Sequence, residues 1–289
     1  MSMCGMRDVR VLAGYDGSLS AAAAIEAGAV LLPSARVWIA FCWTPPFANE
    51  AIRRRLRIRE TGLNDLVAAI EREGAAEAGR ITATGVILAR VAGWTPEPLI
   101  DRSYGGEGFA IGVLAEKVDA DVVVVGSRGL SGASAVLGSV SDVVAHYAPR
   151  PVLVVPYPLL TTESADLATG PVLVGWDGSA GALLALETAR KLFRGRPVVV
   201  ATVSDNAVDP PAAPSEFLRL PARGDHVTPG RAVADALALA ACQRRAAVVV
   251  VGSRGHSAAR EILLGSVAMA TLHHAHRPVL VVRHDAHEP

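Results

Sequence analysis

The sequence predicts an α/β fold with two domains, each built on a five-stranded, mostly parallel sheet that carries helices on both faces. The first observation is that short valine-rich runs alternate with longer alanine- and leucine-rich segments, an order typical of parallel strands joined by right-handed crossovers. The second is that this order of segments begins twice, and VVVVGSRG occurs at residues 122–129 and again at 248–255. The third is the length, because 289 residues suffice for two domains that each bury a core.

In the first half, we expect strands where β-branched and other apolar residues form short runs bounded by glycine, proline or aspartate. These strands are residues 9–14, 37–43, 85–91, 121–125 and 152–155. The expected helices are residues 19–32, 49–80, 109–118 and 133–147. Between the third strand and the next helix, residues 101–108 (DRSYGGEG) form a glycine-rich insertion to which we assign no function.

The second half repeats this order but is shorter. Its main strands are residues 172–175, 197–203, 247–251 and 278–282, and its helices include residues 180–193 and 231–243. Gly14 matches Gly175 at an offset of 161 residues, whereas Gly126 matches Gly252 at 126, so about 35 residues are missing between the second and fourth strands. The residues that remain there are too rich in proline for a long helix. We therefore predict a truncated second domain that keeps a remnant third strand near residues 216–220.

A polar, proline-flanked segment separates the two halves, as is typical of a domain linker. The predicted boundaries are residues 1–157 for the first domain, 158–170 for the linker and 171–289 for the second domain.

Composition narrows the classes of partner and compartment. The 28 basic and 28 acidic residues balance, so we expect neither nucleic acid nor an anionic membrane as a partner. No apolar run is long enough to span a membrane and the N-terminus has no apolar leader, so we expect a cytoplasmic protein. The three cysteines, Cys4, Cys42 and Cys242, form no CxxC pair, which argues against a disulfide framework or a zinc site.

Each VVVVGSRG run leads into a glycine-rich loop that is typical of an anion site. Glycines let the backbone approach a ligand closely, and the Gly-Ser at the end of each loop opens a helix whose free amides and dipole favour phosphate. The loops contain no lysine, which excludes a Walker A loop. The alternative is that the glycines only turn the chain from strand to helix.

These features together resemble the universal stress protein family in its tandem two-domain form. They are the doubled loop, the PVLVV runs at 151–155 and 278–282, and the openings GYDGS and GWDGS at 14–18 and 175–179. The resemblance covers nearly the whole chain and implies two Rossmann-like domains of the adenine nucleotide alpha hydrolase type. In the ATP-binding branch of the family, the loop reads Gly, two residues, Gly, nine residues, Gly, then Ser or Thr.

The resemblance implies ATP as the ligand, accompanied by Mg²⁺. Asp16 and Asp177 would contact the sugar, although Asp-Gly-Ser also caps helices, and the two roles are compatible. The glycines would shape the phosphate path, the serines would donate to the phosphates and the arginines would approach them, while Gly93 would follow the third strand near the base. The first-half residues are Gly14, Asp16, Gly93, Gly126, Arg128, Gly129, Gly138, Ser139, Val140 and Ser141. The second-half residues are Gly175, Asp177, Gly252, Arg254, Gly255, Gly265, Ser266 and Val267.

Each loop departs once from the family pattern. Eight residues separate Gly129 from Gly138, one fewer than the pattern requires, whereas nine separate Gly255 from Gly265. Conversely, the second copy has alanine at 268 where the first has a serine hydroxyl at 141. The sequence therefore leaves open whether one, two or neither of the sites binds ATP.

The sequence offers no arrangement of catalytic groups, so we do not expect an enzyme. His273, His274 and His276 end a helix, where adjacent side chains face apart, and we expect no metal there. The leading hypothesis is an ATP-binding regulatory module of the stress response; the alternatives are an interaction module with degenerate pockets and a slow ATPase or phosphotransferase. By the resemblance, the expected partners are an adenine nucleotide and the protein itself, through an internal pseudo-dimer of the PVLVV strands and a possible homodimer.

Overall fold

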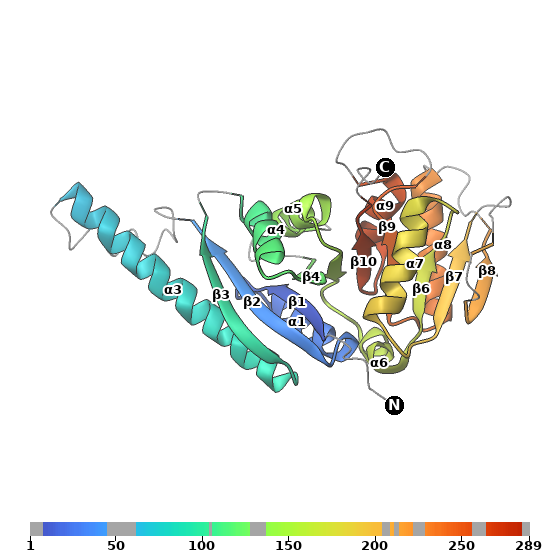
Figure 1. Ribbon diagram of the computed structural model, residues 1–289, viewed down its shortest axis with the longest axis horizontal. Coiled ribbons are helices and arrows are strands. Elements are labelled where there is room, and N and C mark those ends of the chain that lie inside the picture. The colour runs from blue at the N-terminus through green and yellow to red at the C-terminus, as the bar shows by residue number, and fades with distance from the viewer. Residues whose placement is uncertain are drawn as a thin grey trace, which may run out of the picture.

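The computed structural model describes residues 8–44, 62–103, 106–127, 137–203, 209–210, 214–221, 229–255 and 264–284. A single ten-stranded sheet runs through these residues in the order β3-β2-β1-β4-β5-β10-β9-β6-β7-β8 (Figure 1). The first half of the chain consists of β1 (Val9–Gly14), α1 (Leu19–Leu31), β2 (Ala35–Trp43), α3 (Leu63–Val91), β3 (Thr95–Arg102), α4 (Glu107–Lys117), β4 (Val122–Gly126), α5 (Ser139–Tyr147) and β5 (Val152–Val155). Its second half consists of α6 (Thr161–Thr169), β6 (Val172–Gly175), α7 (Ala180–Leu192), β7 (Val198–Thr202), β8 (Glu216–Arg219), α8 (Pro229–Gln243), β9 (Val248–Gly252), α9 (Ser266–His274) and β10 (Val279–Val282).

The sheet is parallel within each half and antiparallel at the junction between β5 and β10. There Leu153 pairs with Leu280 and Val152 with Val281, and all residues of both strands are buried. The predicted pairing of the two PVLVV runs is therefore present. It leaves neither half with an open edge at this side.

Helices cover both faces of the sheet and enclose two cores. Val122 and Val124 of β4 point into the core under α1 and α7, whereas Val123 and Val125 point into the core under α4, α5, α8 and α9. Because successive side chains of a strand alternate between faces, an all-valine strand suits this position. The predicted α/β architecture, mostly parallel with helices on both faces, is confirmed.

The prediction of the third strand was wrong. Residues 85–91 form the last turns of α3, and the third strand is β3. In this stretch Val86 and Ala89 are buried while Ile87 and Val91 are exposed, which is the spacing of a helix packed on one side. A β-carbon at Gly85 would lie 2.6 Å from Tyr15 Cδ1, so this glycine allows the helix to approach the sheet.

The helix expected at 49–80 is thus shifted, and the stretch 101–108 that was expected as an insertion overlaps the ends of two regular elements. Residues 45–61 lie outside the described part, and α3 extends to Val91, projecting beyond the sheet at the left of Figure 1. Within 101–108, β3 ends at Arg102 and α4 begins at Glu107, while residues 104–105 lie outside the described part. Two prolines in β3, Pro96 and Pro98, suit its place at the edge of the sheet.

The polar segment predicted as a linker contains a packed helix, α6. The Asp166 side chain is only 4% exposed; its Oδ2 accepts a hydrogen bond from Arg277 Nη2 at 2.9 Å and its Oδ1 one from Arg245 Nε at 2.8 Å. Burial raises the pKa of Asp166, but the hydrogen bonds from the two arginines outweigh it and bring the pKa below its usual value. Arg277 also donates to Ala246 O at 2.6 Å. Through these hydrogen bonds, α6 is joined to the residues that lead into β9 and into β10.

The truncation of the second half is confirmed where the structure describes it. No helix stands between β7 and β8 in the described residues, and β8 is the short third strand expected near 216–220. Arg244, just after α8, holds this edge strand through two hydrogen bonds to Glu216, at 3.0 and 2.6 Å.

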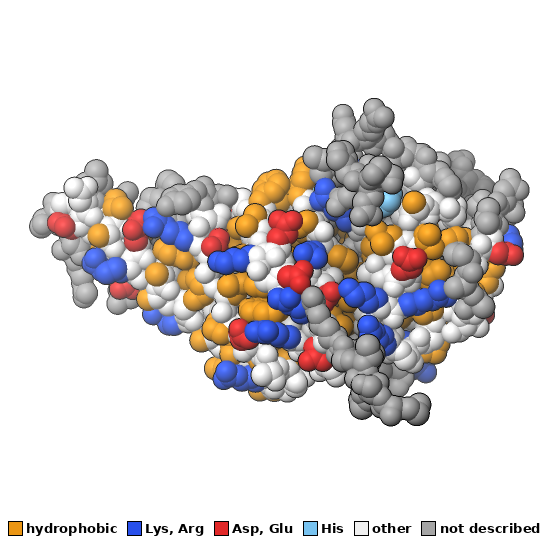
Figure 2. Space-filling model, viewed as in Figure 1, with side chains coloured by type: hydrophobic (Ala, Val, Ile, Leu, Met, Phe, Trp, Pro, Cys, Tyr) orange, Lys and Arg blue, Asp and Glu red, His pale blue; other side chains and the backbone are white. Residues whose placement is uncertain are grey.

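On the face shown in Figure 2, basic and acidic side chains are interspersed rather than gathered by sign. Among the helices that the structure describes, none combines the length and apolar character needed to cross a membrane.

Candidate functional site

Two pockets lie at equivalent places, where the carboxyl ends of β1 and β4, and of β6 and β9, meet. These are the points at which the strand order reverses, where open α/β sheets bind ligands. The cavity in the second half measures about 510 Å³ and that in the first half about 250 Å³. We call them the second pocket and the first pocket.

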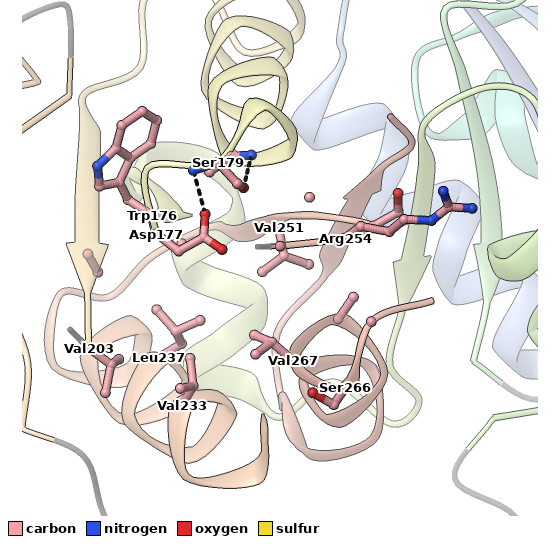
Figure 3. A pocket seen from close by; sticks show the side chains of 18 residues that line it. Trp176, Asp177, Ser179, Val203, Val233, Leu237, Val251, Arg254, Ser266 and Val267 are labelled. Carbon is pink, nitrogen blue, oxygen red and sulfur yellow. Dashed lines mark hydrogen bonds between the residues drawn. The ribbon is translucent and has the colours of Figure 1, made fainter. Parts of the chain in front are cut away.

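The second pocket gathers every site residue predicted for its half of the chain. These residues are Gly175, Asp177, Gly252, Arg254, Gly255, Gly265, Ser266 and Val267. They come from the end of β6 and the turn after it, the end of β9 and the residues just after it, and the start of α9; Figure 3 labels Asp177, Arg254, Ser266 and Val267 of this set.

Asp177 is positioned by a tight turn at the start of α7. Its Oδ1 accepts a hydrogen bond from Ser179 N at 2.9 Å, and Ser179 Oγ in turn accepts one from Ala182 N at 3.2 Å (Figure 3). Gly178 between them has φ +82°, a conformation that favours glycine. The capping role of Asp-Gly-Ser is thus present, and the same carboxylate lines the pocket. A β-carbon at Gly255 would collide with Asp177 Oδ2, so the two motifs are in contact.

The first turn of α9 presents backbone amides to the second pocket. Its N-cap is Gly265, which has no side chain to accept from these amides and whose own N–H donates to Ser253 O at 2.7 Å. The amides of Ser266 and Val267 have no partner within the helix, because the first N–H groups of any helix lack one. Together with the helix dipole they favour an anion at this place.

The glycines that end β4 and β9 have a packing role besides lining the pockets. A β-carbon at Gly252 would lie 2.7 Å from Gly181 O, and one at Gly126 would lie 2.5 Å from Ser20 O. Both carbonyls belong to the first turn of the helix packed against the strand. This packing role differs from the turn from strand to helix that was the alternative reading of the glycines, and it requires glycine because only glycine lets strand and helix come so close.

An apolar corner of the second pocket was not predicted. Val203, Val233 and Leu237 lie together on the side away from Arg254, whose guanidinium points away from them in Figure 3. Their signal in the sequence is indirect, because Val233 and Leu237 belong to a helix face and not to a binding motif.

The first pocket gathers most of the residues predicted for its half. Those that line it are Gly14, Asp16, Gly126, Gly138, Ser139, Val140 and Ser141. Asp16 repeats the turn of Asp177, since its Oδ1 accepts from Ser18 N at 2.9 Å. Arg128 and Gly129 lie outside the described residues.

Two predictions for the first pocket need correction. Gly93 lies in the turn between α3 and β3, with φ +97°, so it precedes the third strand and sits at the opposite end of the sheet from the pocket. The hydroxyl of Ser141 donates to Gly126 O at 2.6 Å, and the side chain is buried. This serine therefore ties α5 to the end of β4, and its proton is not available to a phosphate.

Cys42 and Glu107 also line the first pocket, and neither was predicted to. Burial, with the nearby Asp101 and Glu107 carboxylates, raises the pKa of the Cys42 thiol to about 12. The thiol is therefore protonated at neutral pH and is not a nucleophile.

His273 and His274 lie in the last turn of α9. Burial, chiefly, lowers the pKa of His274, and His273 Nε2 lies 3.1 Å from Met269 Sδ. Throughout the described part of the chain, no three His, Cys, Asp or Glu side chains gather as metal ligands do.

Comparisons with known proteins agree with this geometry. A sequence profile of the universal stress protein family matches residues 9–156 and 221–283, which is more than half of the chain. The chain belongs to the universal stress protein family. A universal stress protein of Mycolicibacterium smegmatis is 32% identical over 219 residues, which cover 68% of this chain and 73% of that protein.

Solved structures share the fold of this universal stress protein. A universal stress protein from Archaeoglobus fulgidus DSM 4304 superimposes with a TM-score of 0.63 at 18% identity, covering 96% of this chain and 99% of the other. A protein of unknown function from Pseudomonas aeruginosa PAO1 gives a TM-score of 0.53 at 14% identity, covering 95% and 92%. At these identities the likeness concerns the Rossmann-like fold alone.

Proposed function

We propose that this universal stress protein binds an adenine nucleotide, ATP in the first instance, in the second pocket. The observation that carries the proposal is one cavity of about 510 Å³ that combines an apolar corner, a carboxylate and an uncapped helix N-terminus. Ligand sites usually span about 300–1,000 Å³ and are mostly apolar with a few convergent polar groups.

Each part of the pocket suits one part of a nucleotide. The corner of Val203, Val233 and Leu237 offers an apolar surface for the base. The Asp177 carboxylate can accept two hydrogen bonds from a ribose diol. The amides that open α9 then meet the phosphates. We infer that Arg254 acts through its backbone, because its guanidinium points away from the base corner.

We propose that Mg²⁺ enters with the nucleotide. Magnesium is commonly held by substrate phosphates, several waters and one or two carboxylates, so it does not require a prebuilt cluster of protein ligands. In the second pocket Asp177 is the carboxylate that the described lining supplies.

We propose a regulatory role, in which nucleotide occupancy alters how the chain associates with itself or with partners in the stress response. The described residues that line the second pocket include one carboxylate and neither histidine nor lysine. Phosphoryl transfer calls for a base that orients the nucleophile and groups that hold the metal and the transferring phosphate. The lining therefore supports binding better than turnover.

Isothermal titration with ATP and Mg²⁺ tests the proposal, with Ser266→Pro as the diagnostic variant. Proline at the first helical position removes one unpaired amide, and the extended Gly265 (φ −64°, ψ 156°) before it is compatible with proline. We expect about tenfold weaker binding, the equivalent of one charge-assisted hydrogen bond, with an unchanged unfolding temperature.

Ser266→Ala is the matched control, because it removes the hydroxyl and keeps the amide. A folded wild-type protein that shows no heat and no thermal stabilisation at millimolar ATP would contradict the proposal.

A further inference from the structure

The two pockets have matching walls, which allows a comparison position by position. A β-carbon on Gly14 would lie 3.5 Å from Ile111 Cδ1, and one on Gly175 would lie 3.2 Å from Leu237 Cδ1. Ile111 therefore corresponds to Leu237, at the offset of 126 residues that also relates the two VVVVGSRG runs.

One turn earlier in the same helices, this offset pairs Glu107 with Val233. Both residues line their pockets, Glu107 from α4 and Val233 from α8. The neighbouring strands give a second pair. Gly14 is opposite Ala40 and Gly175 is opposite Ala201, so Cys42 corresponds to Val203.

The corner that is apolar in the second pocket is therefore acidic in the first. Glu107 Oε1 accepts a hydrogen bond from Thr44 Oγ1 at 2.9 Å, and Asp101 is the strand partner of Cys42. Among the described residues that line the first pocket, Asp16 and Glu107 are carboxylates and none is Lys, Arg or His.

Two features of the first pocket, its small volume and the charge of Glu107, thus weaken it for a nucleotide. Its volume of about 250 Å³ is half that of the second pocket and falls below the usual range for ligand sites. A base pressed against Glu107 would strip water from a charged group, which is unfavourable. Glu107 also adds a second negative charge to the one that both pockets share, and its repulsion of a polyphosphate strengthens as water leaves the site.

We propose that the chain holds one adenine nucleotide, in the second pocket, and that Glu107 is the residue that excludes it from the first. This inference rests on the proposed function, since it assigns the nucleotide to one of two similar sites. Glu107 and Val233 occupy corresponding positions, and by this inference they determine which pocket accepts the nucleotide. Substituting each by the other's residue tests this.

The test is the stoichiometry of ATP binding to the full chain, measured by isothermal titration with Mg²⁺. We expect one site per wild-type chain and a second, weaker site in Glu107→Val. Glu107→Gln keeps the size of the side chain and removes its charge, so it should also gain measurable binding if charge is the barrier. In the opposite direction, Val233→Glu should weaken the wild-type site by about tenfold or more, which corresponds to placing a carboxylate against the base.

Proline variants locate each site independently. Ser266→Pro should weaken the wild-type site, whereas in the Glu107→Val background Ser139→Pro should remove the gained site only. Gly138 before Ser139 is extended, at φ −71° and ψ 153°, as Gly265 is. Thermal unfolding of each variant checks that the fold is kept.

The failures are distinguishable. Two equivalent sites in the wild-type chain, an unchanged stoichiometry in folded Glu107→Val, or full ATP affinity in Val233→Glu would each overturn the inference. If Glu107→Val does not fold, the Val233→Glu titration decides by itself. No binding to the wild-type chain at all would instead overturn the proposed function.

Discussion

The two halves of the molecule build the same frame and fit it with different walls. In both halves an aspartate accepts from the serine two residues on, at 2.9 Å, a glycine ends the central strand against a helix carbonyl, and a glycine opens an uncapped helix. The side chains that face these features across the cavity differ, with Glu107 in one half and Val233 in the other. The comparison teaches that the motif residues build the same frame in both halves, while the residues outside the motif make the two pockets differ.

The largest effect on stability is expected at an arginine that precedes the fifth strand of each half. The two halves pair this arginine with different aspartates. Arg277 pairs with the buried Asp166, whereas Arg150, at the corresponding position, pairs with Asp119, whose side chain is 48% exposed. Asp166→Asn should lower the free energy of unfolding by about 3–5 kcal/mol, because it leaves a buried arginine without its counter-charge. Asp119→Asn should cost less than about 1 kcal/mol.

Urea unfolding of both variants measures this difference, and its pH dependence gives a second check. The folded-state pKa of Asp166 lies below the ordinary value of 3.8, so its contribution is complete above pH 3.8 and is lost as pH falls through the folded pKa. Equal costs for the two substitutions at pH 7 would contradict the pairing.

A smaller and equal effect is expected for the glycines that end β4 and β9. Gly126→Ala and Gly252→Ala should each cost about 1–3 kcal/mol, because the new β-carbon would lie within 2.7 Å of a backbone carbonyl. Gly14→Ala is the control, since its nearest contact would be an ordinary 3.4 Å to Val125. Thermal unfolding measures all three, and a cost in only one half would show that the frames are not equivalent.

Cys42 distinguishes the first pocket chemically, since valine stands at the corresponding position 203. The thiol is buried and its pKa is raised from 9.0 to about 12, so the stability that it contributes is complete below pH 9 and is lost as pH rises toward 12. We expect the unfolding free energy of the wild type to fall relative to Cys42→Ala across this range.

Alkylation at pH 8 gives an independent measurement for the same residue. Iodoacetamide followed by mass spectrometry should label the exposed Cys242 and spare Cys42 in the folded chain. Rapid labelling of Cys42 would contradict the burial that raises its pKa.

The smallest effect is expected at the two outer edges of the sheet. Glu216 is held by Arg244 through two hydrogen bonds, whereas Glu97 of β3 accepts one from Arg36 at 3.0 Å. All four side chains are well exposed, so Glu216→Gln and Glu97→Gln should each cost less than about 1 kcal/mol, with the bidentate pair the larger. Chemical unfolding at low and high salt would measure both, and a cost that salt leaves unchanged would argue against an exposed ion pair.

Local sequence patterns were sufficient to predict the short valine-rich strands. The strands at 152–155 and 172–175 have the predicted bounds, because short valine runs flanked by proline or glycine have few alternatives. The run GVILARV at 85–91 failed, because its composition suits a strand and only its packing against β2 identifies a helix. Asp166 and Arg277 are 111 residues apart and leave no local signature.

The candidate site was predicted in the same uneven way. The predicted residues Gly14, Asp16, Gly126, Gly175, Asp177 and Gly252 do line the two pockets, because the carboxyl ends of parallel strands meet. Glu107 was missed since it belongs to no motif, although the offset of 126 residues relates it to Val233. Gly93 was predicted to lie near the pocket because the third strand was expected before it, at 85–91. The third strand is Thr95–Arg102 and follows this glycine.

The antiparallel contact of β5 with β10 has a consequence for the directions in which the two pockets open. Because each half-sheet is parallel within itself, reversing direction at this contact makes the carboxyl ends of β4 and β9 face opposite ways. A partner protein that docks over the mouth of one cavity thus leaves the other mouth open to solvent. Contacts made at one mouth are therefore spatially separate from contacts made at the other.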